Sequence, residues 1–97
     1  MKLIDKLPEL VADLEGALLP LGRGDLLKQA QDAMLERWSY DDFADTAYLY
    51  LTAERLDRMR LETFSLHDEL GMNLELDDRG RLCGIEIMEG KRITSRL

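Results

Sequence analysis

The chain has 97 residues, of which 45% are hydrophobic and 34% charged, a composition that predicts one globular domain over residues 1–97 and excludes a disordered chain. Its net charge of -7 disfavours nucleic acid as a partner, because an acidic surface repels the phosphate backbone. The chain has one cysteine, no apolar run of the roughly 20 residues that a membrane helix needs, and charges where a signal peptide is apolar, so we expect a cytoplasmic protein without a membrane contact.

Two amphipathic helices are predicted at the start of the chain. Apolar residues recur at helical spacing over residues 5–19 and again over residues 25–38. The link between them, residues 20–24, is short and contains proline and glycine, so we expect an antiparallel helical hairpin over residues 5–38. The residues expected on its buried faces are Leu10, Leu14, Leu18, Leu27, Met34 and Trp38.

From residue 40 onward the apolar period changes from 3.6 to 2, which is typical of strands. We expect an α+β fold in which the helical hairpin lies on a small antiparallel meander of about four strands, within residues 40–89. The four expected strands are near residues 46–52, 61–66, 71–77 and 82–88. The strand residues expected to be buried are Leu49, Leu51, Met72, Leu74, Leu76, Ile85 and Ile87, with Cys83 as an inward, inert thiol.

Four shorter signals complete the pattern. Asp77-Asp78-Arg79-Gly80 predicts a hairpin turn, and Gly84 inside the last strand predicts a bulge or a close contact. The segment 53–60 is long for a turn and has helical character, whereas residues 90–97 are interpreted as a basic tail.

Residues 40–51, with the sequence Tyr-Asp-Asp-Phe-Ala-Asp-Thr-Ala-Tyr-Leu-Tyr-Leu, resemble the opening of a bacterial family, domain of unknown function 2283. That opening has the form Tyr-Asp-x-x-x-Asp-x-x-Tyr followed by aliphatic residues. A second block at residues 73–87 is similar to the family's aliphatic strand, acidic-Gly turn and Gly-Ile-Glu-Ile strand. The resemblance covers about residues 40–89, leaves the helical hairpin outside, and implies a compact antiparallel sheet. It implies no activity, but some members sit beside small toxin-like proteins, which implies an antitoxin-like role.

Acidic residues are concentrated in the middle of the chain. Residues 40–78 carry eleven acids against three arginines, a balance of -8, whereas residues 79–97 carry five bases against two acids, a balance of +3. Such a negative field favours a basic protein partner, although it also serves solubility alone. The residues singled out for partner binding are Asp41, Asp42, Asp45, Asp68 and Glu69.

Few residues are candidates for chemistry. Asp41, Asp42, Asp45, Asp77 and Asp78, if the fold clusters them, offer the oxygen ligands that Mg²⁺ or Ca²⁺ takes. A small metal-dependent hydrolase using this Asp cluster and His67 is the alternative function. The spacing of Asp41, Asp42 and Asp45 lacks the Gly and terminal Glu of a calcium loop, so turn and cap chemistry is the simpler interpretation. His67, the single histidine, is interpreted as an exposed loop residue. We therefore expect a protein-interaction module with no catalytic residue, metal or cofactor.

The expected sheet has two unpaired edges, and a 97-residue core gains from additional burial, so we also expect a homodimer. Tyr48 and Tyr50 share one side of their strand. Because the segment around them is acidic, we interpret them as packing beneath the helices or at a subunit interface and not as a platform for stacking bases.

Overall fold

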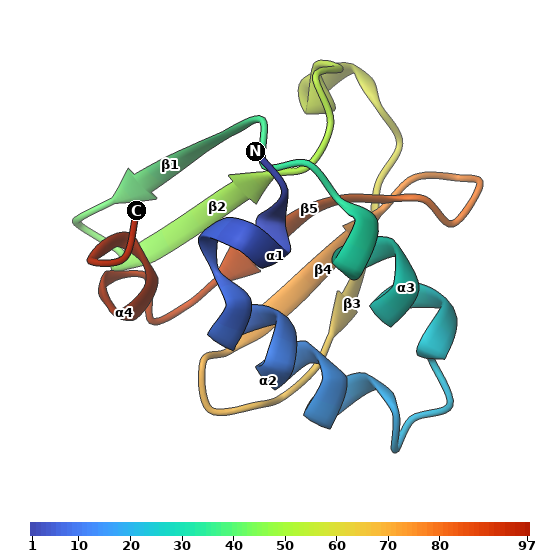
Figure 1. The fold of residues 1–97 in the computed structure, drawn as a ribbon. Coiled ribbons are helices and arrows are strands. Elements are labelled where there is room, and N and C mark those ends of the chain that lie inside the picture. Colours follow the sequence, from blue (N-terminus) through green and yellow to red (C-terminus); the bar gives the residue numbers. More distant parts are fainter.

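The computed structural model describes residues 1–97 and consists of a helical layer on one face of a five-stranded antiparallel sheet (Figure 1). The helices are α1 (Leu3–Lys6), α2 (Pro8–Leu18), α3 (Gly24–Asp32) and α4 (Lys91–Thr94). The strands are β1 (Arg37–Asp41), β2 (Thr46–Tyr50), β3 (Glu62–Ser65), β4 (Met72–Leu76) and β5 (Leu82–Ile87), and a 3₁₀ helix, η1 (Leu56–Arg58), lies between β2 and β3. The predicted α+β class is confirmed. No helix is both long enough and apolar enough to cross a membrane.

The strands follow the order β1-β2-β5-β4-β3 across the sheet, and every neighbouring pair is antiparallel. A meander in sequence order would pair β2 with β3, and this pairing is wrong. Instead β2 pairs with β5, and residues 51–61 carry the chain across to β3 at the far edge of the sheet. Burial explains this order, since five of the six residues of β5 are buried, whereas Glu62, Thr63 and Ser65 of β3 are exposed. The most apolar strand therefore lies in the centre and the polar strand at an edge. Within the crossover, η1 confirms the helical character predicted for residues 53–60.

The strand β1 lies where apolar spacing predicts the end of the second helix. The helix α3 ends at Asp32, and Ala33 is already extended, with φ -68° and ψ 145°. The carbonyl of Ala33 accepts a hydrogen bond of 2.9 Å from the N–H of Leu3, so the chain pairs here with its own N-terminal segment. The prediction that Met34 and Trp38 are buried is wrong, because they are 44% and 45% exposed.

The remaining predicted core positions are confirmed. One row crosses the sheet through Leu49, Ile85 and Leu74, which are paired neighbours with no exposed surface. Each such side chain contributes about 1.5–3 kcal/mol relative to an exposed one. Ile93 anchors α4 in the same core, so residues 91–94 of the predicted tail form a packed helix. The confirmed buried positions are Leu10, Leu14, Leu18, Leu27, Leu49, Leu51, Met72, Leu74, Leu76, Ile85 and Ile87.

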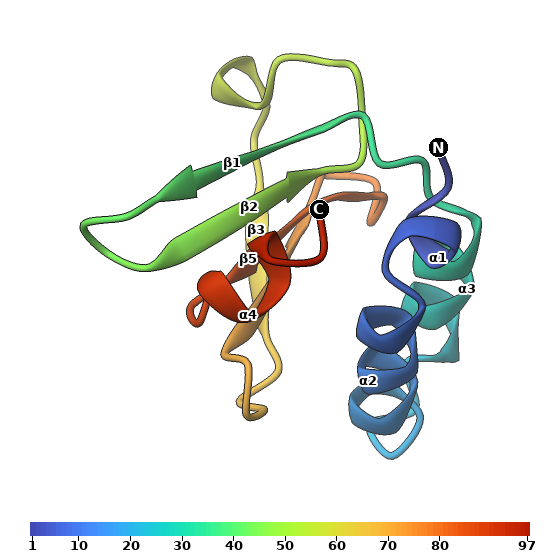
Figure 2. The same ribbon diagram turned by 60° about the vertical axis from the view of Figure 1, so that its left-hand side comes forward.

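The face of the sheet opposite the helices is open (Figure 2). Tyr48 and Tyr50 lie on it with ring centroids 4.7 Å apart, so the interpretation that they pack beneath the helices is wrong. Gly84 makes the predicted close contact, because a Cβ there would clash with the Tyr48 hydroxyl. Cys83 is 2% exposed, and this burial raises the pKa of its thiol, as expected for an inert cysteine.

Candidate functional site

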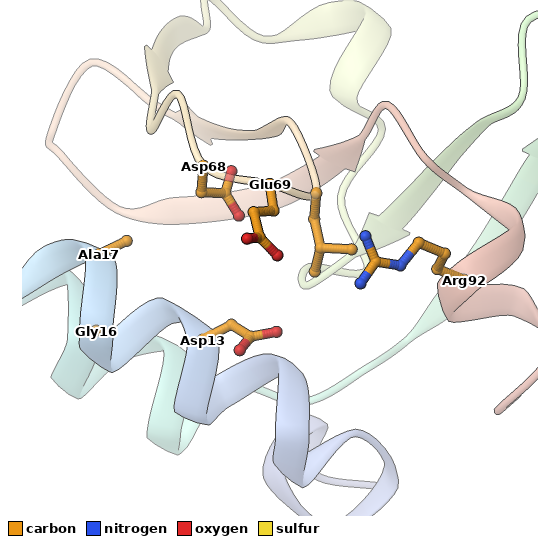
Figure 3. A pocket seen from close by; sticks show the side chains of 7 residues that line it. Asp13, Gly16, Ala17, Asp68, Glu69 and Arg92 are labelled. Atoms are coloured by element: carbon orange, nitrogen blue, oxygen red, sulfur yellow. The ribbon is translucent and has the colours of Figure 1, made fainter.

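A groove of about 390 Å³ lies between α2, the β3–β4 loop and α4 (Figure 3). Its polar side chains are Asp13, Asp68, Glu69 and Arg92, and the rest of its lining is Gly16, Ala17 and Leu70. In Figure 3 the carboxylates of Asp13 and Glu69 and the Arg92 guanidinium are directed into the space between α2 and the loop. The groove therefore combines an acidic rim with small residues that keep the α2 side open.

The two walls of the groove follow from local structure. On α2, Leu10 and Leu14 face the core, so Asp13 points to solvent. The opposite wall is held by Asp68, whose Oδ1 accepts a hydrogen bond of 2.7 Å from the Met72 N–H. These contacts place carboxylates from two separate elements at one opening.

The β3–β4 loop makes a sharp turn, which orients its acidic pair. His67 and Gly71 have positive φ values of 54° and 63°. Gly71 has a second reason to be glycine, since a Cβ there would lie 2.8 Å from the Cβ of Met88. His67 is exposed in this loop, as predicted.

Arg92 is the cation of the groove. Its Nη1 donates a hydrogen bond of 2.8 Å to Glu89 Oε2, and this bond is the main reason that the pKa of Arg92 is raised. The charges of Glu69 and Asp13 raise the pKa further. Three carboxylates, those of Asp13, Asp68 and Glu69, line the groove with this one guanidinium, and Glu89 binds it from beside the groove, so the groove has an excess of negative charge.

The other three predicted partner residues lie elsewhere, in the β1–β2 loop. Asp41 Oδ1 accepts hydrogen bonds from the N–H groups of Phe43 and Ala44, at 3.0 and 3.4 Å, which is turn chemistry. Asp42 is exposed beside it. Asp45 is engaged by the start of α4, so of the five predicted residues only Asp68 and Glu69 line the groove.

The aspartates do not converge on a metal site. No group of three or more His, Cys, Asp or Glu side chains has the arrangement that holds a metal ion. Asp77 is 5% exposed and is occupied within its own turn, where Oδ1 accepts the N–H groups of Arg79 and Arg81 at 2.9 and 2.8 Å. The turn and cap interpretation accounts for Asp41 and Asp77 by these bonds.

A second groove of about 380 Å³ has a lining of mixed charge. Arg58 and Arg60, which belong to the acidic middle segment, lie there with Arg79 and Arg81, and the other charged lining residues are Glu54, Asp77 and Asp78. This groove is next to the β4–β5 turn, at the other end of β4 from Asp68 and Glu69. The first groove, with three carboxylates and one guanidinium, is the more acidic of the two.

Asp13 and Arg92 were not identified from the sequence. They come from α2 and α4, near opposite ends of the chain, and neither belongs to a local motif that sets it apart from other surface charges. The helical pattern around Asp13 indicates only that it is exposed.

A family model described as "Protein of unknown function (DUF2283)" matches residues 37–89. Neither a curated protein nor a solved structure matches the chain. The match spans all five strands and includes Asp68 and Glu69, whereas Asp13 and Arg92 lie outside it. The groove is thus formed jointly by the family's sheet and by the helices that flank it in this chain.

Proposed function

The chain belongs to the DUF2283 family, whose description assigns no activity, and we propose from its groove that it is a protein-interaction module that binds a basic partner without catalysing a reaction. The observation that carries this proposal is that the groove already accommodates a guanidinium. Arg92 lies there among carboxylates that outnumber it. A lysine or arginine side chain of a partner that enters the groove meets the same carboxylates.

The carboxylates outside the groove affect the rate at which such a partner associates. Exposed carboxylates increase the association rate more than they hold a complex together, and salt screens them. The loop aspartates Asp41 and Asp42 lie outside the groove and contribute to this long-range field. We therefore propose that Asp13, Asp68 and Glu69 contact the partner. Asp41 and Asp42 of the β1–β2 loop steer it toward the groove.

The partner class follows from the family resemblance. A small, basic, toxin-like protein has the charge that this groove accepts, and its neutralisation by binding requires no chemistry from the chain. This antitoxin-like role and a cytoplasmic location are parts of the same proposal.

The proposal is tested with a hexa-arginine peptide as the probe. We expect amide chemical-shift changes at α2, the β3–β4 loop and α4, and an association rate that falls as salt is added. The double variant Asp13→Asn, Glu69→Gln is expected to weaken binding. The matched control, Asp5→Asn with Glu62→Gln, removes the same charge from exposed positions outside both the groove and the β1–β2 loop. Equal weakening by the two double variants, or shifts away from the groove, would contradict the proposal.

A further inference from the structure

The strand β1 is an open edge of the sheet. It pairs with β2 alone, and four of its five residues are exposed. Figure 2 shows the β1–β2 ribbon extending beyond α1, α2 and α3. Its register is continuous and its sequence, Arg-Trp-Ser-Tyr-Asp, has no proline, so β1 has neither the bulge nor the proline that often protects an edge from pairing.

The sequence of β1 is complementary to itself. When two copies run antiparallel and are centred on Ser39, Arg37 of each copy lies opposite Asp41 of the other, and Trp38 lies opposite Tyr40. Centring the pair one residue earlier or later, on Trp38 or Tyr40, puts no opposite charges across from each other. The other edge strand, β3, with the sequence Glu-Thr-Phe-Ser, has no such register because it carries a single charge.

The side chains of β1 are already placed for this contact. Pairing with β2 puts Arg37, Ser39 and Asp41 on the open face of the sheet and Trp38 on the face of the helices. The Arg37 guanidinium lies 3.9 Å from the centroid of the Tyr50 ring, which holds it on the open face.

Asp41 and Trp38 can each make a further contact. Asp41 uses Oδ1 for its loop and accepts no hydrogen bond on Oδ2. Trp38 lies opposite Leu49 on the face of the helices and is 45% exposed, so a partner ring can cover it.

We propose that a second copy of this chain pairs with β1 about a two-fold axis at Ser39, which joins the two five-stranded sheets into one. The contact is isologous, with two Arg37–Asp41 pairs on the open face and two Trp38–Tyr40 pairs on the other. None of the residues that line the acidic groove belongs to β1, so the dimer leaves both grooves accessible. A ladder of five residues buries an area at the lower end of the range of protein interfaces. The dimer therefore forms as the concentration rises into roughly the micromolar range or above.

The direct test is a cysteine at the axis. Opposed residues of an antiparallel pair have Cα atoms about 4.5–5.5 Å apart, within the range that a disulfide spans. Ser39→Cys is therefore expected to oxidise to a species of twice the 11.2 kDa chain mass on a non-reducing gel. The matched control is Ser65→Cys, at an exposed position on the other edge strand. The wild type, whose Cys83 is buried, is the blank. Crosslinking of Ser39→Cys no faster than that of Ser65→Cys would overturn the proposal.

The register is tested without a crosslink. Arg37→Glu puts a carboxylate opposite Asp41 twice per dimer and is expected to raise the dimer dissociation constant on the order of tenfold, with a smaller rise for Arg37→Gln. Sedimentation over a wide concentration range measures both values. A wild-type chain that stays at 11.2 kDa at every concentration, or an Arg37→Glu chain that dimerises as wild type does, would contradict the inference.

Discussion

The carboxylate of Asp45 holds the start of α4, because its Oδ1 accepts a hydrogen bond of 3.0 Å from the Lys91 N–H. The same oxygen accepts the Tyr40 hydroxyl at 2.7 Å, and this bond lowers the pKa of Asp45 and raises the pKa of Tyr40 to about 12. Asp45 thus joins the β1–β2 hairpin to the C-terminal helix.

Asp45→Ala is expected to lower the Tm by several degrees, since it removes both bonds and places alanine at a φ of 51°. Asp45→Asn should lower it less, because asparagine keeps an acceptor and tolerates that φ. Thermal unfolding followed by circular dichroism measures the change. The control is Asp42→Ala, at an exposed position of the same loop. Similar losses for Asp45→Ala and Asp42→Ala would show that the link to α4 does not stabilise the fold.

Two aspartates stabilise the fold only while they are ionised. The hydrogen bond from the Arg81 N–H is the main cause that lowers the pKa of Asp77, and the Tyr40 hydroxyl lowers that of Asp45. A folded-state pKa below the unfolded one contributes stability that is complete above the unfolded pKa of about 4 and is lost as pH falls through the folded pKa. The contribution of Asp45 and Asp77 to the free energy of unfolding should be level above about pH 5 and should fall below about pH 4. Burial raises the pKa of Glu75, so protonation of that carboxyl acts in the opposite direction as the pH falls.

Urea unfolding at a series of pH values checks this expectation. Asp77→Asn should start with lower stability at neutral pH and then show a shallower fall in acid, because it has no charge to lose. A variant curve that runs parallel to that of the wild type would remove Asp77 as a cause.

The parts of the fold that could be predicted depend on residues close together in the chain. The β4–β5 hairpin is one case, since Asp77, Gly80 and the alternation of Met72, Leu74 and Leu76 all lie within one short segment. The pairing of β2 with β5 is different, because it brings together strands separated by more than thirty residues and depends on which strand is the most apolar overall. At residues 33–38, the spacing of Met34 and Trp38 also matches a helix, but long-range contacts hold the chain extended there, through the bond of Ala33 with Leu3 and the pairing of β1 with β2.

The candidate site shows the same division. Asp68 and Glu69 stand out in the sequence because they are adjacent acids in a loop, and both line the groove. Asp41, Asp42 and Asp45 stand out for the same reason, but they lie in the β1–β2 loop and do not line the groove. Charge density in a sequence does not show which acidic loop the fold places beside α2 and α4.

Gly84 and Tyr48 form a contact that a side chain at residue 84 would destroy. Gly84→Ala is expected to lower the free energy of unfolding by about 1–3 kcal/mol, because the added Cβ meets the Tyr48 ring and hydroxyl. In a Tyr48→Ala background the same substitution should cost much less, and a double-mutant cycle by urea unfolding measures the difference. Gly16→Ala is the control, since nothing lies near its Cβ and alanine favours the helix by roughly 0.5–1 kcal/mol. An undiminished cost in the Tyr48→Ala background would place the strain elsewhere.

Gln29 joins the helical layer to the end of the sheet. Its Oε1 accepts a hydrogen bond of 2.7 Å from the Leu82 N–H, and its Nε2 donates one of 3.1 Å to the Gly80 carbonyl. Leu82 is 8% exposed, so Gln29→Ala leaves its N–H without an acceptor and with little access to water. The expected loss is about 1–3 kcal/mol in the free energy of unfolding, together with faster hydrogen exchange at the Leu82 amide.

Gln31→Ala provides the matched control, because it removes the same kind of side chain from the same helix, where no side-chain hydrogen bond is lost. Gln29→Glu should lose less stability than Gln29→Ala, since it keeps the acceptor for Leu82 but replaces the donor to Gly80 with a second oxygen. If Gln29→Ala and Gln31→Ala lose equal stability and the Leu82 amide exchanges at the wild-type rate, then α3 is held on the sheet by its buried leucines alone.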